Sequence, residues 1–224
     1  MTDGSPDQDN RCRNTDPDSI CKGVVPHDMF EILMNGVFAF VMTIIVRNNI
    51  PLPPLSSSDD LEYLREYVGV MHGDILGFIF VFVIFAVFYI LFFEMLRNIR
   101  RLDRYFVYLS FGLALSLIFT PLTSLLYNFS DMPIPYGILF HANVLLTGLV
   151  MFVLWKHASH NQNLLYAGTD PARVRNISLR LLLFPAAAVA GLVFDSLDVT
   201  VGPVLNTIIF AVPCIAFVVL SRKS

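Results

Sequence analysis

Charge is the first property that this chain has little of. Only 15% of its 224 residues are charged, whereas a soluble globular domain carries about a quarter. Hydrophobic residues make up 55% of the chain, including 20 Phe, and the mean hydropathy is +0.65. This composition is typical of a protein embedded in lipid and excludes a soluble enzyme. The formal net charge of −3 also excludes the basic field of a nucleic-acid-binding domain.

Cysteines, targeting signals and catalytic motifs are scarce or missing as well. Cys12, Cys21 and Cys214 have no zinc-site spacing, so we expect plain thiols and no disulfide framework. Residues 1–28 are polar and acidic and lack the apolar core of a signal peptide. We therefore expect the first apolar run to insert as an uncleaved segment. The chain contains no HExxH, no GxSxG and no phosphate-binding glycine loop.

Two histidines have a spacing that metal ligands also use. His157 and His160 lie three residues apart, on one helical face. Asp170 is the one nearby candidate for a third ligand, so we interpret the two histidines as an ordinary pair at the membrane interface. We predict that the protein is not an enzyme and has no catalytic residue, no cofactor-binding residue and no metal ligand.

Long apolar runs dominate what is present. Ile75–Phe93 contains nineteen residues without a charge, about the length that crosses a bilayer core. The pattern predicts an all-α, polytopic membrane protein with six transmembrane helices, which are Met29–Val46, Asp74–Leu96, Tyr105–Tyr127, Tyr136–Trp155, Leu179–Phe194 and Val199–Leu220. Pro121, Pro185 and Pro213 fall inside these runs, as lipid-embedded bundles allow.

The positive charges predict the orientation of these helices. Thirteen Lys and Arg residues fall on one side of the six spans, and only Arg47 and Arg65 fall on the other. Because positive residues remain inside, both termini are predicted to be cytoplasmic. We divide the chain into a polar, disordered cytoplasmic segment (1–28), a six-helix transmembrane domain (29–220) and a cytoplasmic tail (221–224). We place the protein in the cell membrane as a multi-pass protein.

The loop between the first two spans is acidic. Its start, Pro51-Leu52-Pro53-Pro54, is expected to be extended. Ser56 to Asp59 can then cap a short amphipathic helix around Leu61–Val68. The carboxylates here would concentrate cations at a channel mouth; the alternative is ordinary solvated loop charge.

The first span carries a stripe of small and polar residues. At helical spacing, Gly36, Phe40, Thr43 or Ile44, and Arg47 lie on one face. Such a stripe is typical of helix packing, and it also suits the wall of an ion pathway. The residues alone leave both interpretations open.

Several motifs resemble one channel family in their residues and order. The run Gly36-Val37-Phe38-Ala39-Phe40-Val41-Met42-Thr43-Ile44-Ile45 resembles part of the R-x-x-x-F-S-D-G-V-F-A-I-A-I-T-L-L signature of the endosomal/lysosomal potassium channel family (transmembrane protein 175 and its prokaryotic relatives). Similar elements follow in the expected order, namely Phe88-Tyr89, Arg100-Arg101-Leu102-Asp103-Arg104, Phe119-Thr120-Pro121-Leu122-Thr123, Leu139-Phe140-His141-Ala142-Asn143, and Arg180 followed by Pro185. The resemblance covers about residues 29–220.

This resemblance implies a homotetramer of six-helix subunits whose first helices line a central pore. Four copies of Phe40 and Ile44 would form a hydrophobic constriction, with Thr43 hydroxyls beside it and Asn35 and Gly36 at the cytoplasmic entrance. The family lacks a carbonyl filter, so selectivity would rest on partial dehydration, which favours potassium over sodium. The implied function is a potassium-permeable leak channel, with potassium as its permeant ion and with membrane lipid and further copies of the chain as its partners.

The sequence also departs from the family signature. Met29 stands where the signature has Arg, Leu33 where it has Phe, and Met34-Asn35 where it has Ser-Asp. Both charges of that motif are therefore replaced together, and Phe40 replaces an aliphatic residue. These replacements favour the alternative function, a non-conducting membrane scaffold or regulatory protein of the same fold.

Overall fold

The computed structural model describes residues 26–49, 61–127, 136–160, 164–166, 168–196 and 209–217. Within these ranges the chain is almost entirely helical. Five long helices follow in order, α1 (His27–Asn49), α2 (Leu61–Arg97), α3 (Arg104–Tyr127), α4 (Tyr136–His160) and α5 (Pro171–Ser196). Residues 209–217 form a sixth, shorter helical segment. The predicted all-α fold is confirmed. Of the predicted terminal segments, residues 1–25 of the segment 1–28 and the whole tail 221–224 lie outside the described residues, and His27 and Asp28 belong to α1.

All five labelled helices contain stretches long and apolar enough to cross a membrane, which are His27–Val46, Gly77–Arg97, Arg104–Ser124, Gly137–His160 and Pro171–Phe194. A helix satisfies its backbone polar groups internally, so it is the form in which such apolar runs can lie in lipid. Together these helices support a multi-pass membrane protein. Of the predicted sixth span, the structure describes residues 209–217, and they are helical.

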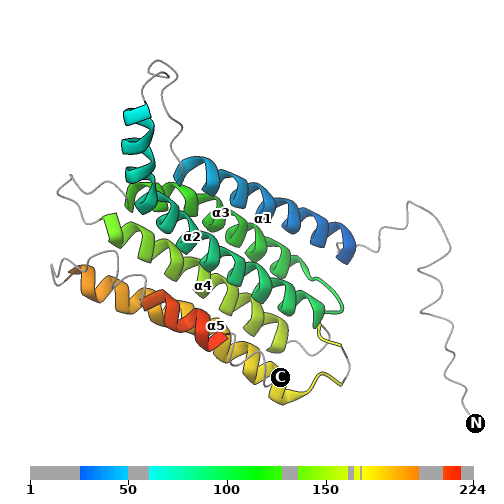
Figure 1. Cartoon of the computed structure of the whole chain (residues 1–224). Helices are drawn as coiled ribbons and strands as arrows, with labels where there is room; N and C mark the ends of the chain where they lie inside the picture. Colours follow the sequence, from blue (N-terminus) through cyan, green and yellow to red (C-terminus); the bar gives the residue numbers. More distant parts are fainter. Residues whose placement is uncertain are drawn as a thin grey trace, which may run out of the picture.

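The helices lie side by side in one bundle (Figure 1). Helix α4 packs against α3 and α5, and α1 packs against α2 and α3. The segment 209–217 contacts α2 and α4 through Phe210, whose ring centroid lies 5.8 Å from that of Phe80 and 6.1 Å from that of Phe140. Helix α1 thus lies at one side of the bundle and packs against α2 and α3.

All five labelled helices are longer than the predicted spans, and α2 and α5 extend furthest beyond them. Helix α5 begins at Pro171, eight residues before the predicted Leu179, because Asp170 caps it: its Oδ1 accepts a hydrogen bond from the Ala172 amide at 2.9 Å. The short helix expected around Leu61–Val68 is instead the first part of α2, which continues without a break to Arg97. This part projects beyond the bundle in Figure 1.

Glycines allow α4 and α5 to approach closely. A Cβ atom added at Gly148 would lie 2.7 Å from the Pro185 ring, and one added at Gly191 would lie 2.5 Å from the His141 ring. Small residues at such contacts are typical of membrane bundles, where close packing replaces the hydrophobic effect between helices. Pro185, which interrupts α5, therefore fits against a position that lacks a side chain.

The loops at the basic end of the bundle are tied to each other. Between α2 and α3, the Arg100 amide donates to the Leu164 carbonyl at 2.7 Å, and the Tyr166 amide donates to the Asn98 carbonyl at 3.3 Å. Ile99 and Leu165 form the central pair of this antiparallel bridge. The α2–α3 loop is therefore held against the loop that precedes α5.

Candidate pore-lining site

The two faces of α1 have different surroundings. One face is buried against α2 and α3 and consists of Phe30, Met34, Phe38, Val41 and Ile45. These residues recur at intervals of three or four, which places them along one side of a helix. They are the part of α1 that builds the subunit.

Phe38 is the centre of the buried face. Its ring centroid lies 5.3 Å from that of Phe85, 5.2 Å from that of Tyr89 and 5.7 Å from that of Phe92, all on α2. Nearer the start of α1, the ring of Phe30 packs edge-on against Phe106 of α3 at 6.1 Å. Ring pairs of this kind add stabilisation beyond the area they bury. Helix α1 is therefore held by aromatic contacts on two neighbouring helices.

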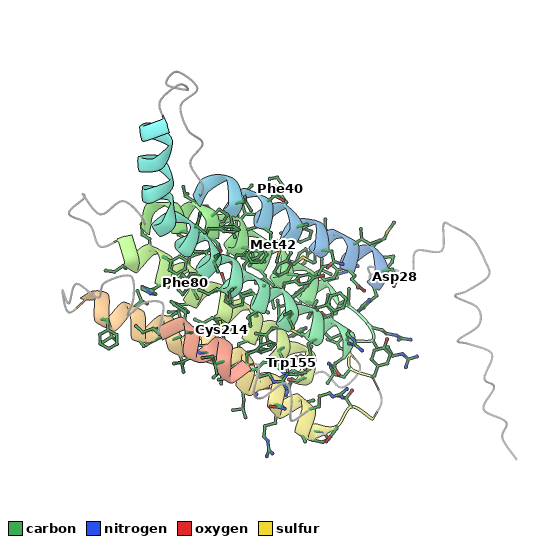
Figure 2. All side chains as sticks on the ribbon, viewed as in Figure 1. Asp28, Phe40, Met42, Phe80, Trp155 and Cys214 are labelled. Carbon is green, nitrogen blue, oxygen red and sulfur yellow. The ribbon has the colours of Figure 1, made fainter. Side chains whose placement is uncertain are left out.

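The opposite face of α1 is uncovered by the rest of the subunit. Its exposed residues between positions 29 and 46 are Met29, Ile32, Leu33, Gly36, Ala39, Phe40, Thr43 and Val46. None of them is charged. Phe40 points away from the bundle in Figure 2, whereas Met42 points toward it. The subunit thus presents one helix face that is apolar except for a single hydroxyl.

Three of the five residues predicted for the pore lie together on this face. Gly36, Phe40 and Thr43 are exposed, and a Cβ atom added at Gly36 would meet nothing within 4 Å. Asn35 and Ile44 lie at the edges of the face and are half-buried. Phe40 is 59% exposed, so most of its surface does not pack against other residues of the same subunit.

The polar groups near this face are few and their contacts are simple. Thr43 Oγ1 donates to the Ala39 carbonyl at 2.9 Å, so its lone pairs remain directed away from the backbone. Within the described ranges the side-chain amide of Asn35 makes no hydrogen bond to another residue. The same ranges hold no group of three His, Cys, Asp or Glu side chains that could bind a metal ion. The face can act on ions only through apolar surface, a hydroxyl and an amide.

An ion pair between α2 and α5 was not predicted. Arg180 of α5 donates from Nη1 to both carboxylate oxygens of Glu94 on α2, each at 3.0 Å. Arg180 is only 1% exposed, and its guanidinium also lies 5.8 Å from the Phe217 ring centroid. These contacts join α2, α5 and the segment 209–217. The sequence offered one signal for this contact: an acidic residue, Glu94, and a basic residue, Arg180, each lie near the edge of a predicted span.

A polar seam between α3 and α4 was also missed, although two of its residues belong to motifs of the family resemblance. Asn143 Nδ2 donates to Thr120 Oγ1 at 3.0 Å, and Thr147 Oγ1 donates to Ser116 Oγ at 3.1 Å. All four side chains are buried. Hydrogen bonds of this kind link helices in membranes, where water cannot take the place of a partner.

His157 and His160 do not form a metal site with Asp170. His157 Nε2 lies 2.7 Å from Asp103 Oδ2, and the other oxygen of Asp103 accepts the Phe106 amide at 2.8 Å. Asp103 therefore caps α3 and contacts α4 at the same time. His160 is exposed, and Asp170 caps α5, so the three residues do not converge.

Known proteins are similar to this chain in sequence over part of its length and in overall fold. The family model described as "Endosomal/lysosomal potassium channel TMEM175" matches residues 29–121, which comprise nearly all of α1 together with α2 and most of α3. A crystal structure of a lysosomal potassium-selective channel TMEM175 homolog from Chamaesiphon minutus is similar in fold, with a TM-score of 0.67 at 16% identity over 88% of this chain and 97% of that chain. No curated protein sequence matches. The family resemblance predicted from the sequence is confirmed.

Proposed function

Because its first three helices match this potassium channel family and its fold is that of a family homologue, we propose that the protein is a potassium-permeable leak channel. Its pore is lined by α1, and Phe40, with Ile44 one turn further, forms a hydrophobic constriction that acts as gate and filter. The observation that carries the proposal is the division of α1 into a buried aromatic face and an uncovered apolar face, with Gly36, Phe40 and Thr43 on the latter.

The shape of the uncovered face requires more than one copy of the chain. A single subunit contributes one such face and cannot enclose a pore with it. Four copies around an axis would place four Phe40 rings opposite one another, and the aromatic contacts of Phe38 would hold each α1 in place from behind. We therefore propose a homotetramer in the cell membrane, with both termini on the cytoplasmic side.

Ion discrimination in such a pore depends on water. No charged side chain lies among the exposed residues of α1 between Met29 and Val46, so a passing ion receives no ionic partner there. A narrow apolar passage makes an ion lose part of its hydration, which costs sodium more than potassium, and it can also close by dewetting. The Thr43 hydroxyl beside the constriction offers oxygen lone pairs to the ion as it passes.

A second candidate is a non-conducting membrane scaffold of the same fold. The observation that favours it is the exposed apolar surface at the start of α1, where Met29 is 69% and Leu33 is 47% exposed. Met29 replaces the arginine of the family signature, and Asn35 replaces its aspartate. An apolar, uncharged entrance suits protein packing as well as it suits ion entry.

One experiment separates the two candidates. The purified protein is reconstituted into liposomes at a known number of copies per vesicle, and potassium efflux is measured against protein-free vesicles and against vesicles that hold an unrelated membrane protein. A channel gives efflux that rises with protein density and favours potassium over sodium. Efflux at the level of protein-free vesicles from a preparation of tetrameric mass would reject conduction and favour the scaffold.

A further inference from the structure

The basic end of the bundle carries two arginines that form no ion pair with an acid of the described residues. Arg101 and Arg104 are exposed, and no carboxylate of the described residues lies within ion-pair distance of either guanidinium. The two acids closest to them in sequence are already engaged: Asp103 contacts His157 and caps α3, and Glu94 binds Arg180 with both oxygens. Two positive charges therefore remain available to an external anion.

The backbone that carries these arginines is fixed. The Arg100 and Arg101 amides both donate to the Leu164 carbonyl, at 2.7 Å and 3.4 Å. Ile99 and Leu102, on either side, are almost completely buried, and Asp103 fixes the first turn of α3. An anion bound here would therefore meet two arginine side chains on a fixed backbone and would not have to order a loose loop.

An exposed stripe on α3 begins directly at Arg104. We call it the α3 stripe; it consists of Arg104, Tyr108, Phe111, Leu115, Phe119 and Leu122, which recur at intervals of three or four along one side of the helix. Tyr108 is 69% exposed. The stripe extends for about 27 Å from Arg104 to Leu122 at 1.5 Å per residue, which is close to the thickness of the hydrocarbon core. Gly112 lies exposed within it, and nothing lies within 4 Å of the position that its Cβ would take.

Along this surface, charged, amphipathic and apolar side chains follow one another in the same order as the phosphate, the interfacial region and the acyl chains of a phospholipid. Two arginines at the end of the apolar spans match a phosphate, Tyr108 lies at the depth where tyrosine meets both water and lipid, and the apolar remainder matches an acyl chain. We propose that Arg101, Arg104 and the α3 stripe bind an anionic phospholipid of the leaflet predicted to be cytoplasmic. Its phosphate lies on the two arginines, and one acyl chain lies along the stripe, over Gly112. This site does not depend on ion conduction.

The test measures lipid binding directly. The purified protein in detergent is titrated with dioleoyl phosphatidylglycerol or with dioleoyl phosphatidylcholine, and bound lipids are counted by native mass spectrometry. The wild-type protein should prefer phosphatidylglycerol. The double variant Arg101→Gln/Arg104→Gln should lose this preference by about five-fold for each arginine removed. A matched control is Arg173→Gln/Arg175→Gln on α5, which removes two exposed charges at the same end of the bundle and should keep the preference.

Two further measurements test the acyl part and the competing occupants. Gly112→Leu should lower phosphatidylglycerol binding while the melting temperature stays the same or rises, because its side chain takes the place of the acyl chain and a Cβ there meets no neighbour within 4 Å. Soluble glycerol 3-phosphate should not displace the lipid. Full displacement would show that the surface recognises only the phosphate group, and it would overturn the proposal. It would also be overturned if the arginine variant kept its preference, or if Gly112→Leu changed the oligomeric mass, which would show that a second copy of the chain covers the stripe.

Discussion

Phe38 and Phe40 point to opposite sides of α1, although only one residue separates them. Phe38 is 1% exposed and is surrounded by three aromatic rings of α2, whereas Phe40 is 59% exposed. Two residues correspond to about 200° of rotation around a helix of 3.6 residues per turn. The same side chain therefore has a packing role at one position and is available to line a pore at the other, which allows the two roles to be tested separately.

Phe38→Ala is expected to destabilise the subunit, and Phe40→Ala is expected to change conduction. Removing the buried ring of Phe38 leaves a cavity that costs about 3–5 kcal/mol. Phe40→Ala leaves no cavity inside the subunit but widens the proposed constriction, so potassium efflux should rise and discrimination against sodium should weaken. Thermal unfolding in detergent and ion flux in liposomes, each normalised to folded protein, measure the two effects.

The opposite pattern would reject the pore assignment. If folded, tetrameric Phe40→Ala protein gives unchanged or lower potassium efflux, Phe40 does not line the constriction.

Thr43→Val is expected to lower potassium efflux without unfolding the protein. The two side chains have nearly the same shape, and the hydroxyl that is lost only donates to the Ala39 carbonyl of its own helix. Its removal takes away the single hydroxyl of the uncovered face and makes the constriction easier to dewet. The control is Thr123→Val on α3, whose hydroxyl bonds only to the Phe119 and Thr120 carbonyls of its own helix and whose loss should leave efflux unchanged. Equal efflux for the two variants would mean that Thr43 does not contact the ion path.

The ion pair of Glu94 and Arg180 is expected to act as a unit. Glu94→Gln removes the carboxylate from a guanidinium that is 1% exposed, and a buried charge left without its partner costs about 3 kcal/mol. The double variant Glu94→Gln/Arg180→Met should recover most of that loss, since it removes the buried charge as well. Unfolding measured for both single variants and the double variant gives the coupling energy. If the losses in unfolding free energy of the two single variants add up to that of the double variant, Glu94 and Arg180 do not stabilise each other.

The apolar runs were sufficient to predict the helices, but the residues at which the helices begin and end depend on local signals such as capping side chains and prolines. The start of α5 at Pro171 was missed because Arg173 and Arg175 were counted as loop residues, although Asp170 followed by proline is a readable helix start. Helical periodicity placed Gly36, Phe40 and Thr43 on one face of α1, but it did not say whether that face is packed or exposed. That depends on which helices pack against α1, and so does the environment of Asn35.

Contacts between distant helices were beyond the reach of the sequence. Arg180 and Glu94 are 86 residues apart, and Asn143 and Thr120 are 23 residues apart. Periodicity assigns each of these residues to a face of its own helix, but it does not say which helix that face meets or at what height. The charges and amides were visible, whereas their pairing depends on the packing order of the bundle.

The last prediction concerns the closest approach between α4 and α5. Gly191→Ala and Gly112→Ala are the same substitution in a helix, where alanine is intrinsically favoured over glycine by about 1 kcal/mol. Their surroundings differ. A Cβ at Gly191 would lie 2.5 Å from both Cδ2 and Nε2 of His141, whereas a Cβ at Gly112 would meet nothing within 4 Å.

The His141 ring has little room to move away from a new methyl group. It is completely buried and stacks on Phe210 with a centroid distance of 5.6 Å and an angle of 7° between the rings. Overpacking of this kind costs about 1–3 kcal/mol, which outweighs the helix preference. Gly191→Ala should therefore lower the melting temperature measured by circular dichroism in detergent, and Gly112→Ala should leave it unchanged or raise it. If both variants melt at the same temperature, α4 and α5 do not require a glycine at position 191 to pack together.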